Sequence, residues 1–221
     1  FSSLALDSSN NPHIAYYDAS LGDLKYAYLS GGSFVSETVD STGTVGRYPS
    51  LRLTSSGEPV IAYYDSSNTD LKYAVRSGSS WSVSTVDSSG RAGEYASLAL
   101  DLSGTPHIAY FVGSPDYNLR YASNSGSGWV FETVAEEGDV GRYSSIAIDP
   151  DGEPCIAFLE ADEKDLFLSC RDGGSWSTFS VDSEGEVGLG ISFVLDTDGI
   201  PHIAYYDATN RALKYATMVP D

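Results

Sequence analysis

Apolar and polar residues alternate along short runs of this chain, which is the pattern of β-strands. The run PHIAYYD at Pro12–Asp18 returns letter for letter at Pro201–Asp207, and variants of it begin at Pro59, Pro106 and Pro154. In every copy, the four positions after the second residue stay non-polar. Because neighbouring side chains of a strand point to opposite faces, we expect both faces of these runs to be buried.

The run recurs at steps of 47, 47, 48 and 47 residues, and three further strand-like runs accompany it in each of the first four units. Examples of these runs are Ser3–Asp7, Asp23–Ala27 and Trp81–Val86. Turn sequences rich in glycine separate them, and no segment has the apolar period and the caps of a helix. The sequence therefore predicts an all-β chain built from repeated four-stranded antiparallel units.

Four-stranded units of this length, repeated along a chain, are typical of the blades of a β-propeller. We therefore predict one β-propeller domain over residues 1–221, with five blades of four antiparallel strands. The fifth unit has no fourth run, so the last blade should lack its outer strand, and Ala212–Ala216 should form an exposed edge that can pair with another chain. The repeat units are 3–49, 50–96, 97–144, 145–191 and 192–221.

The chain is strongly acidic, with 31 Asp and Glu against 12 Lys and Arg and a formal net charge of −19. Negative charge repels phosphate backbones and anionic membrane surfaces, so we expect no nucleic-acid partner. No run reaches the apolar length of a membrane span, and we expect no membrane insertion. Abundant Ser, Gly, Tyr and Thr with few Lys favour an extracellular or cell-surface location.

The stretch LDTDGIPHIAY at Leu195–Tyr205, together with a Trp that opens the fourth run of several units, resembles the repeats of sialidase-like (BNR-type) β-propellers. The full Asp-box of sialidases is not met, and only its Asp-x-x-Gly turn is present. Five units of about 47 residues are also similar to the five-bladed tachylectin-type lectins. The first resemblance implies a glycoside-processing enzyme, and the second implies a carbohydrate-binding lectin.

The predicted loops that join the fourth strand of one repeat unit to the first strand of the next gather charged and aromatic residues. They read Gly-Arg-Tyr at 46–48 and 141–143 and Gly-Glu-Tyr at 93–95. In propellers these segments share a face with the loops after the second strand, where carboxylates recur. Aromatic rings and charged groups are what a sugar site needs, although tyrosines packed between blades and charges paired at the rim would give the same pattern. The predicted ligand-binding residues are Arg47, Tyr48, Glu94, Tyr95, Arg142, Tyr143, Asp18, Asp65 and Asp207.

Other chemically active residues receive structural interpretations. His13, His107 and His202 occupy one repeat position, and we predict that they form hydrogen bonds between blades or to turns rather than bind a metal. The Asp-x-Asp-Gly turns at 149–152 and 196–199 resemble the start of a calcium loop, but plain turns are preferred, so we predict no cofactor and keep calcium as the weaker alternative. The aromatic residues that open the fourth runs are predicted to be packing residues at the outer part of each blade rather than ligand platforms; they are Phe34, Trp81, Trp129 and Trp176.

The two cysteines, Cys155 and Cys170, are predicted to be cross-strand neighbours if Glu160 faces Asp165, and either a disulfide or a reduced apolar pair fits that position. No nucleophile–base constellation and no catalytic or metal residues emerge. The hypothesis favoured by these patterns is a non-enzymatic binding module for carbohydrate. The alternatives are a glycoside-processing enzyme of sialidase-like ancestry and a protein-interaction or surface scaffold propeller.

Overall fold

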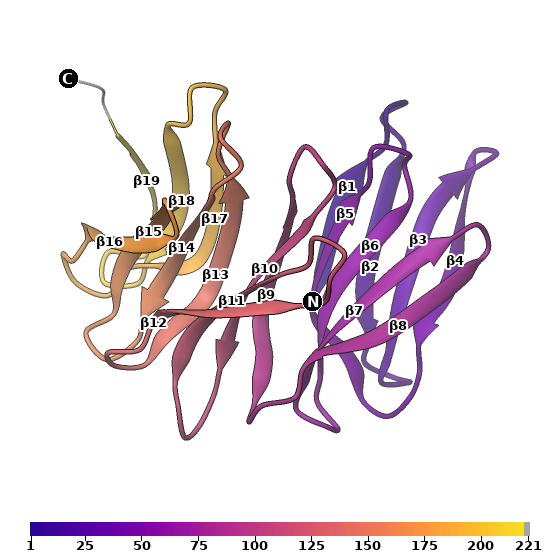
Figure 1. Ribbon diagram of the computed structural model, residues 1–221, viewed down its shortest axis with the longest axis horizontal. Helices are drawn as coiled ribbons and strands as arrows, with labels where there is room; N and C mark the ends of the chain where they lie inside the picture. Colours follow the sequence, from indigo (N-terminus) through magenta and orange to yellow (C-terminus); the bar gives the residue numbers. More distant parts are fainter. Residues whose placement is uncertain (219–221) are drawn as a thin grey trace. The chain divides into compact units, whose positions relative to one another are not determined.

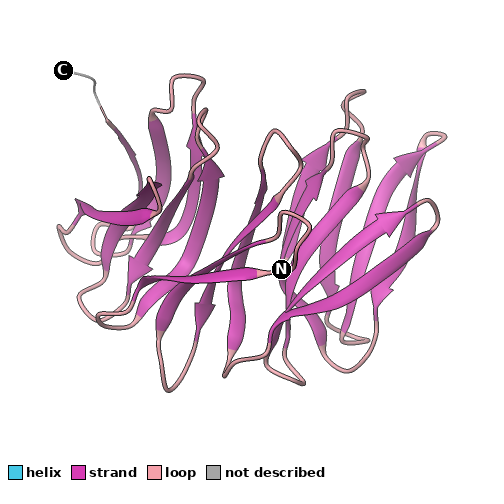
Figure 2. Cartoon of the chain, in the orientation of Figure 1, coloured by secondary structure: helices cyan, strands magenta, loops and turns pink. Residues whose placement is uncertain are grey.

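The computed structural model describes residues 1–218, in which strands and loops account for the whole chain and no residue is helical (Figures 1 and 2). It divides into two compact units, Phe1–Leu98 and Ala99–Asp221. The described strands form five antiparallel sheets, four with four strands and one with three. The predicted all-β class and the three-stranded last sheet are thereby confirmed. With no helix in the described part, none is present there that could span a membrane.

Each sheet takes its strands in sequence order. Sheet 1 holds β1 (Ser2–Leu6), β2 (Pro12–Asp18), β3 (Asp23–Ser30) and β4 (Ser33–Asp40), and sheet 2 holds β5 (Val45–Leu53), β6 (Pro59–Asp65), β7 (Asp70–Ser77) and β8 (Ser80–Asp87). Sheet 3 holds β9 (Ala92–Leu100), β10 (Pro106–Val112), β11 (Asn118–Ser123) and β12 (Val130–Ala135). Sheet 4 holds β13 (Val140–Ile148), β14 (Pro154–Glu160), β15 (Asp165–Asp172) and β16 (Ser175–Asp182), and sheet 5 holds β17 (Leu189–Leu195), β18 (Pro201–Asp207) and β19 (Ala212–Thr217).

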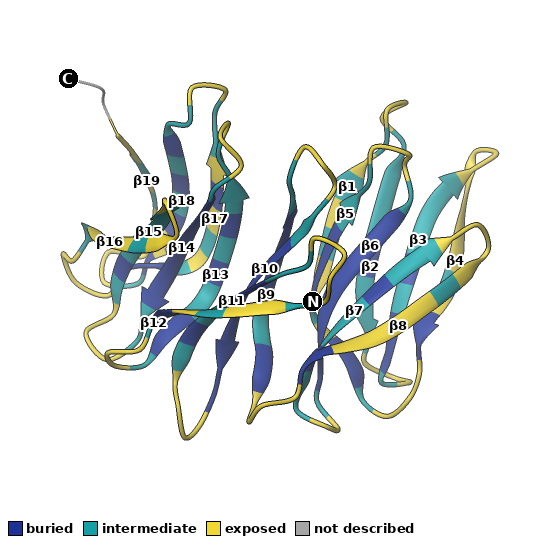
Figure 3. Cartoon of the chain, viewed as in Figure 1, coloured by how far each residue is buried: buried dark blue, intermediate teal, exposed yellow. Residues whose placement is uncertain are grey.

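The PHIAYYD run forms the second strand of each sheet, and in sheets 2 to 5 it is the most deeply buried strand. In sheet 2 every residue of β6 is buried (Figure 3), and Ile61, Ala62 and Tyr63 have no exposed surface. Because Ile61 and Tyr63 face one way and Ala62 the other, both faces of this strand are covered. The prediction that both faces are buried is confirmed for sheets 2, 3 and 4. It is wrong for the first and last sheets, because only Ala15 of β2 is buried and Tyr206 of β18 is 41% exposed.

Serine hydroxyls join the first strand of one sheet to the first strand of the next. Ser3 Oγ in β1 accepts a hydrogen bond from the backbone N–H of Leu51 in β5, at 3.0 Å. The same bond recurs one repeat later, from the N–H of Leu98 to Ser50 Oγ at 2.9 Å, and again in the second unit, from Phe193 to Ser145 Oγ. The serine that returns once per repeat therefore fixes how neighbouring sheets are aligned.

A glycine at the start of β5 lets two sheets approach closely. Gly46 has a φ of 99°, and a Cβ placed on it would lie 2.7 Å from the Cα of Leu24 in β3. Gly141 in β13 repeats this arrangement, with a φ of 105° and a distance of 2.8 Å to the Cβ of Leu119. No other residue fits either place, because any side chain would collide with backbone and would also strain the left-handed conformation.

The Gly-Arg-Tyr segments were expected to be connecting loops, and this expectation is wrong. Strand β5 begins at Val45 and includes residues 46–48, with register shifts on both sides of Arg47 in its pairing with β6. Tyr48 takes a φ of 50° there. Two β-bulges let the strand absorb these extra residues, and a bulge depends on the approach of the neighbouring sheet as well as on local sequence.

The third strand of sheet 5, β19, lies at the edge of its sheet within the described residues. Its Leu213 is 81% exposed and its Tyr215 is 60% exposed, whereas the corresponding Leu166 in sheet 4 is fully buried. The edge character of this strand is therefore confirmed for the described chain. Pairing of this edge with another chain stays a prediction.

Candidate ligand-binding sites

The tyrosines of the Gly-Arg-Tyr segments form an aromatic cluster in the first unit. The ring centroids of Tyr48 and Tyr95 lie 4.6 Å apart and those of Phe1 and Tyr48 4.4 Å apart, with the rings of both pairs tilted against each other. Aromatic rings at such distances stabilise one another. The structure thus brings Tyr48 and Tyr95 together, but largely as packing partners of each other.

The charged residues of these segments differ in their partners. Arg142 forms a bidentate pair with Asp139 and lies 5.2 Å over the ring of Phe111. Glu94 accepts a hydrogen bond from Arg91 at 2.7 Å. Arg47 is exposed, and its guanidinium lies 5.6 Å over the ring of Tyr17. Of the predicted charged residues in these segments, Arg47 is therefore the most accessible to a ligand.

The aspartates predicted to lie beside them stabilise their own turns. Asp65 Oδ1 accepts backbone N–H bonds from Ser67 and Asn68, while its Oδ2 accepts one from the Asn68 side chain. Asp207 uses Asn210 in the same way, and Asp18 accepts backbone bonds from its turn. Asp65 and Asp207 are also buried. These contacts give the carboxylates a turn-stabilising role that sequence reasoning did not assign.

Each repeated histidine hydrogen-bonds to a tyrosine on the next strand of its own sheet, so the expected bond between blades is wrong, whereas His202 does bond to Asp196 of the preceding turn. His107 in β10 shares a hydrogen bond of 2.6 Å between Nδ1 and the hydroxyl of Tyr121 in β11. Its Nε2 lies 3.6 Å from Asp101, which opens the preceding turn. His13 with Tyr26 and His202 with Tyr215 repeat the pair. Burial lowers the pKa of His107, so this ring is neutral at pH 7.

The calcium-like turns use their carboxylates on their own backbone. Asp149 Oδ1 accepts bonds from the N–H groups of Asp151 and Glu153, and Asp196 does the same in the next turn. Within residues 1–218, no three His, Cys, Asp or Glu side chains converge in a way that could hold a metal ion.

The cysteines are joined. Cys155 in β14 pairs with Cys170 in β15, and Glu160 pairs with Asp165 at the other end of the same hairpin, as the sequence predicted. The two sulfurs form a disulfide. Of the two alternatives left open by the sequence, the structure contains the disulfide.

A cluster that sequence reasoning missed lies between sheets 1 and 2. Arg76 of β7 donates from Nε and Nη2 to the carboxylate of Glu37 in β4, at 3.1 and 2.7 Å. The indole Nε1 of Trp81 donates to the same carboxylate at 3.1 Å, and its ring packs edge-on against Tyr26 at 5.3 Å. Burial raises the pKa of Glu37, but the bonds from Arg76 and Trp81 outweigh burial and hold that pKa below its usual value.

The same cluster recurs between sheets 3 and 4. Arg171 binds Glu132 through Nε and Nη2, and Trp176 Nε1 donates to Glu132 at 2.8 Å. Trp176 packs edge-on against Tyr121 at 5.4 Å. The signal was present in the sequence. Glu37 lies in the first repeat unit with Arg76 and Trp81 in the second, and Glu132 in the third repeat unit is followed by Arg171 and Trp176 at the matching positions of the fourth. Only a search for residue pairs between one repeat unit and the next, rather than an alignment of the units on one another, could have found the cluster.

These contacts also decide the role of the aromatic residues that open the fourth strands. Trp81 and Trp176 are packing residues, as predicted, and the structure shows that each packs against the neighbouring sheet. Phe34, at the same position in sheet 1, is 58% exposed, so its predicted packing role is wrong. No earlier sheet in the first unit lies against that side of β4.

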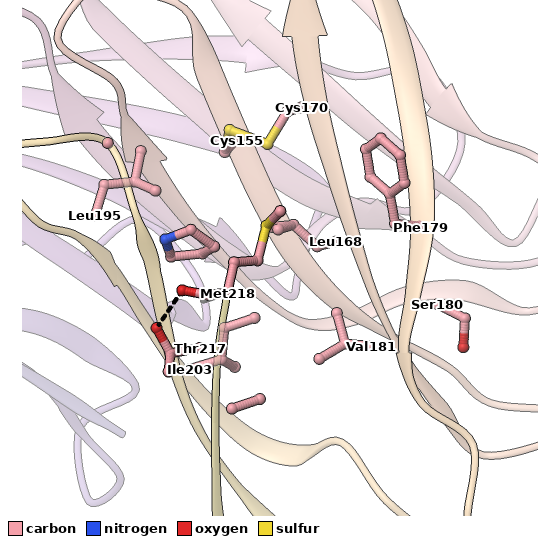
Figure 4. Close-up of a pocket in the computed structure, with 13 residues that line it drawn as sticks. Cys155, Leu168, Cys170, Phe179, Ser180, Val181, Leu195, Ile203, Thr217 and Met218 are labelled. Atoms are coloured by element: carbon pink, nitrogen blue, oxygen red, sulfur yellow. Dashed lines mark hydrogen bonds between the residues drawn. A yellow bond between two sulfur atoms is a disulfide. The ribbon is translucent and has the colours of Figure 1, made fainter. Parts of the chain in front are cut away.

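A cavity of about 510 Å³ lies between sheets 4 and 5. Figure 4 shows the disulfide, Leu168 and Phe179 on the side of sheet 4, facing Ile203 of sheet 5 and Met218, which follows β19. Sheet 5 has no fourth strand within the described residues, so no tryptophan fills this place as Trp81 and Trp176 do elsewhere. The lining is almost wholly apolar, which suits an aliphatic or aromatic group better than a sugar.

No family model matches the chain, and no curated protein matches its sequence. Solved structures do match its fold. A triple arginine-to-alanine mutant of AofleA from Arthrobotrys oligospora has a TM-score of 0.72 at 12% identity, over 99% of this chain and 68% of that one. The Aleuria aurantia lectin, in complex with Fucα1-6GlcNAc, has a TM-score of 0.64 at 15% identity, over 98% of this chain and 74% of that one.

The Aleuria aurantia protein is a fungal lectin with a six-bladed β-propeller fold and a fucose recognition site. A third match is an ulvan lyase from a new family of polysaccharide lyases, with a TM-score of 0.60 at 14% identity, over 93% of this chain and 66% of that one. At such identities the likeness concerns the fold. The chain has the fold class of the β-propellers, and fucose-binding lectins are among its structural neighbours.

Proposed function

We propose that this chain is a non-enzymatic carbohydrate-binding module in which each of the five sheets acts as a propeller blade. The observation that supports it most is the Glu–Arg–Trp cluster, which recurs at two sheet junctions on a fold shared with fucose-binding lectins. The two copies are Glu37, Arg76 and Trp81, and Glu132, Arg171 and Trp176.

The cluster has the chemistry that sugar hydroxyls require. A hydroxyl both donates and accepts, and a guanidinium beside a carboxylate offers both kinds of partner in fixed geometry. The side chains of Arg76 and Glu37 are 20% and 24% exposed, so they are held in place yet reachable from solvent. Tyr28, whose ring lies 5.4 Å from the Arg76 guanidinium, adds an aromatic surface for the apolar face of a sugar.

Two equivalent clusters favour multivalent binding. A weak site gains apparent affinity when a second site on the same molecule engages the same glycan surface. The clusters are not identical, because Arg171 also binds Glu153 through Nη1 at 3.0 Å. We therefore expect the site at Arg76 to bind more tightly than the site at Arg171, whose guanidinium has two carboxylate partners.

A second candidate location for the same function lies in the first compact unit, at Arg47, Tyr48, Glu94 and Tyr95, and a third lies in the second compact unit, at Arg142 and Tyr143. Arg47 is exposed beside aromatic rings. The packing of Tyr48 against Tyr95 and the pairing of Arg142 with Asp139 count against these locations. Turn-bound Asp18, Asp65 and Asp207 contribute least to them.

A glycan-binding screen tests the proposal, with fucosylated and non-fucosylated glycans on the same surface. The wild type is compared with Arg76→Lys/Arg171→Lys, which keeps the charge but loses bidentate geometry. Arg47→Ala/Arg142→Ala serves as the comparison variant, because it removes the arginines of the other candidate locations. We expect the first variant to bind at least tenfold more weakly and the second to bind as the wild type. The reverse result would move the site, and no glycan bound by the wild type would overturn the lectin function.

The same screen separates binding from turnover. A polysaccharide lyase cleaves by elimination and leaves an unsaturated uronate that absorbs ultraviolet light. Such a product from ulvan or a related polymer would favour an enzyme, in line with the structural likeness to an ulvan lyase. A glycan that is bound and recovered unchanged supports the non-enzymatic module.

We also propose an extracellular or cell-surface location. The disulfide between Cys155 and Cys170 supports it, because disulfides persist mainly in oxidising compartments. Thiol labelling of protein taken directly from its source tests this, and two free thiols there would contradict it.

A further inference from the structure

A second cavity, of about 290 Å³, opens between sheets 3 and 4 in the second unit. Its floor includes the stacked rings of Phe158 and Phe167, whose centroids lie 5.9 Å apart with an interplanar angle of 20°. Three carboxylates line it, from Glu136, Glu137 and Glu160. The cavity therefore combines aromatic surface with negative charge.

The equivalent place between sheets 1 and 2 holds a cation of the chain itself. The ammonium of Lys72 in β7 lies 2.5 Å from the carboxylate of Asp40 and 3.7 Å from that of Asp65. The same nitrogen lies 5.9 Å from the ring centroid of Tyr63, whose hydroxyl donates to Asp40. The Lys72 ammonium therefore occupies this position at the junction of sheets 1 and 2, next to an aromatic ring and two carboxylates.

The arrangement recurs between sheets 4 and 5. Lys214 forms ion pairs with Asp182 and Asp207, and its ammonium lies 5.9 Å from the ring of Tyr205. The hydroxyl of Tyr205 donates to Asp182 at 2.6 Å. Two separate junctions of the same repeat therefore place a lysine ammonium at this position.

Between sheets 3 and 4 the cation is replaced while negative charge remains. Ala135 stands where the other junctions have Asp40 and Asp182, Phe158 stands for the tyrosine, and Phe167 stands for the lysine. Glu160 keeps the carboxylate of Asp65 and Asp207, and Glu136 and Glu137 add two more at the mouth.

Glu160 accepts backbone N–H bonds from Asp162 and Glu163, but within residues 1–218 no cationic side chain forms an ion pair with the three carboxylates of the cavity. Burial raises the pKa of Asp165, and Glu160 and Glu163 raise it further. At the matching position of sheet 2, burial and Asp65 also raise the pKa of Asp70, but there the charge of Lys72 opposes the rise. The cations next to the cavity are held elsewhere, because Lys164 pairs with Glu186 and Arg142 pairs with Asp139. The cavity is thus a place for an ammonium that the chain does not supply.

We propose that this cavity binds a protonated primary amine and that its ligand is an amino sugar. The ammonium would sit on the phenylalanine rings beside the carboxylates, as the lysine ammonium does at the other two junctions. The volume is close to the lower limit of small-molecule pockets, about 300 Å³, and suits one monosaccharide. The choice of a sugar as the carrier of the amine rests on the proposed carbohydrate-binding function.

Isothermal titration of the whole chain with glucosamine tests this proposal. N-acetylglucosamine, which lacks the charge, and glucose, which lacks the nitrogen, are the matched controls. We expect glucosamine to bind at least tenfold more tightly than either. Equal binding of the three sugars, or no binding of glucosamine, would overturn the proposal.

A variant designed from the chain itself sharpens the test. Ala135→Asp/Phe167→Lys restores the ion pair of the other junctions and should abolish glucosamine binding, while fucosylated glycans still bind through the Glu–Arg–Trp clusters. Glu136→Gln/Glu137→Gln leaves the floor intact, should weaken glucosamine about fivefold or more, and covers the case in which the first variant melts early. Unchanged affinity in this second variant would contradict the site.

Two further arms separate this proposal from the proposed lectin function. Arg76→Lys/Arg171→Lys should bind glucosamine as the wild type does, even if its glycan binding is lost. Propylammonium chloride probes the amine without a sugar. Propylammonium binding without glucosamine binding would overturn the amino-sugar assignment and leave an amine site of another kind.

Discussion

The junction between sheets 1 and 2 and the junction between sheets 3 and 4 share the contacts that hold their sheets together, but the residues at one end of each junction differ. Both use a glycine against a leucine of the preceding sheet and both carry a Glu–Arg–Trp cluster. At the other end, one holds Asp40, Tyr63 and Lys72 in a polar network, and the other holds Ala135, Phe158 and Phe167 around a cavity. The shared parts hold sheets together, and the variable end is where one junction can acquire its own ligand.

The largest expected effect comes from breaking the part that both junctions share. Gly46→Ala and Gly141→Ala should each destabilise the chain by about 3–5 kcal/mol, because the new Cβ meets a leucine below 3.0 Å and the backbone is left-handed. Denaturant unfolding measures both. Gly78→Ala is the control, since no atom lies within 4 Å of its Cβ, and it should cost about 1 kcal/mol. If only one of the two glycine variants lost stability, the close glycine–leucine contact would not have the same role at both junctions.

Removal of the indole should affect the two junctions equally. Trp81→Ala and Trp176→Ala each lose an edge-on aromatic contact and a hydrogen bond to a glutamate, and we expect about 2–4 kcal/mol for each because both rings are only partly buried. Melting temperatures of the two variants give the comparison. A difference above about 1.4 kcal/mol, tenfold in the unfolding constant, would mean that one cluster contributes more to stability than the other.

The polar network should give the first junction an acid-sensitive stability that the second lacks. Burial raises the pKa of Asp40, but hydrogen bonds from Lys72 and Tyr63 hold it below its usual value. A carboxyl with a lowered folded pKa stabilises the fold above its unfolded pKa of about 3.9, and this contribution disappears as the pH falls through the folded value. Asp40→Asn should therefore cost about 1–3 kcal/mol at pH 7 and progressively less below about pH 4. Urea midpoints measured across this range test it, and a constant difference would refute it.

The smallest effect concerns a histidine that one sheet replaces with valine. The folded pKa of His107 is lowered by burial, so the folded state resists protonation below the unfolded pKa of about 6.5. Stability should decline as the pH drops below that value, by about 1 kcal/mol or less. His107→Val, which copies Val60 of sheet 2, should remove this decline. Unfolding curves at pH 7 and pH 5 measure the slope, and an equal decline in both proteins would contradict the assignment.

The sequence repeat was sufficient to predict the strands and the pairing inside each sheet. Equal spacing of the prolines located the second strands, and the pairing of Glu160 with Asp165 followed from the hairpin and placed Cys155 opposite Cys170. These features depend on local alternation and turn length, which a single sequence records directly.

Contacts between sheets were harder to predict. Glu37 and Arg76 are 39 residues apart and belong to different units, so aligning the repeats places them in separate columns. The bulge at Arg47 depends on how closely Leu24 approaches Gly46, which no local pattern states. The predicted site residues were found at one end of the sheets, but their partners, Asp139 and Arg91 among them, were not foreseen.

The serine hydrogen bonds between first strands have a direction, because the hydroxyl of one sheet always accepts from the backbone N–H of the following sheet. Ser3 and Ser50 each accept from the sheet that follows, so sheet 2 offers a donor, the Leu51 N–H, on one side and an acceptor, Ser50 Oγ, on the other. A stretch of gene encoding one repeat can be copied in tandem without the invention of a new contact surface, because each copy already matches its neighbour. By the same logic, any association that reuses these hydrogen bonds must run head to tail, and a two-fold symmetric dimer cannot be made from them.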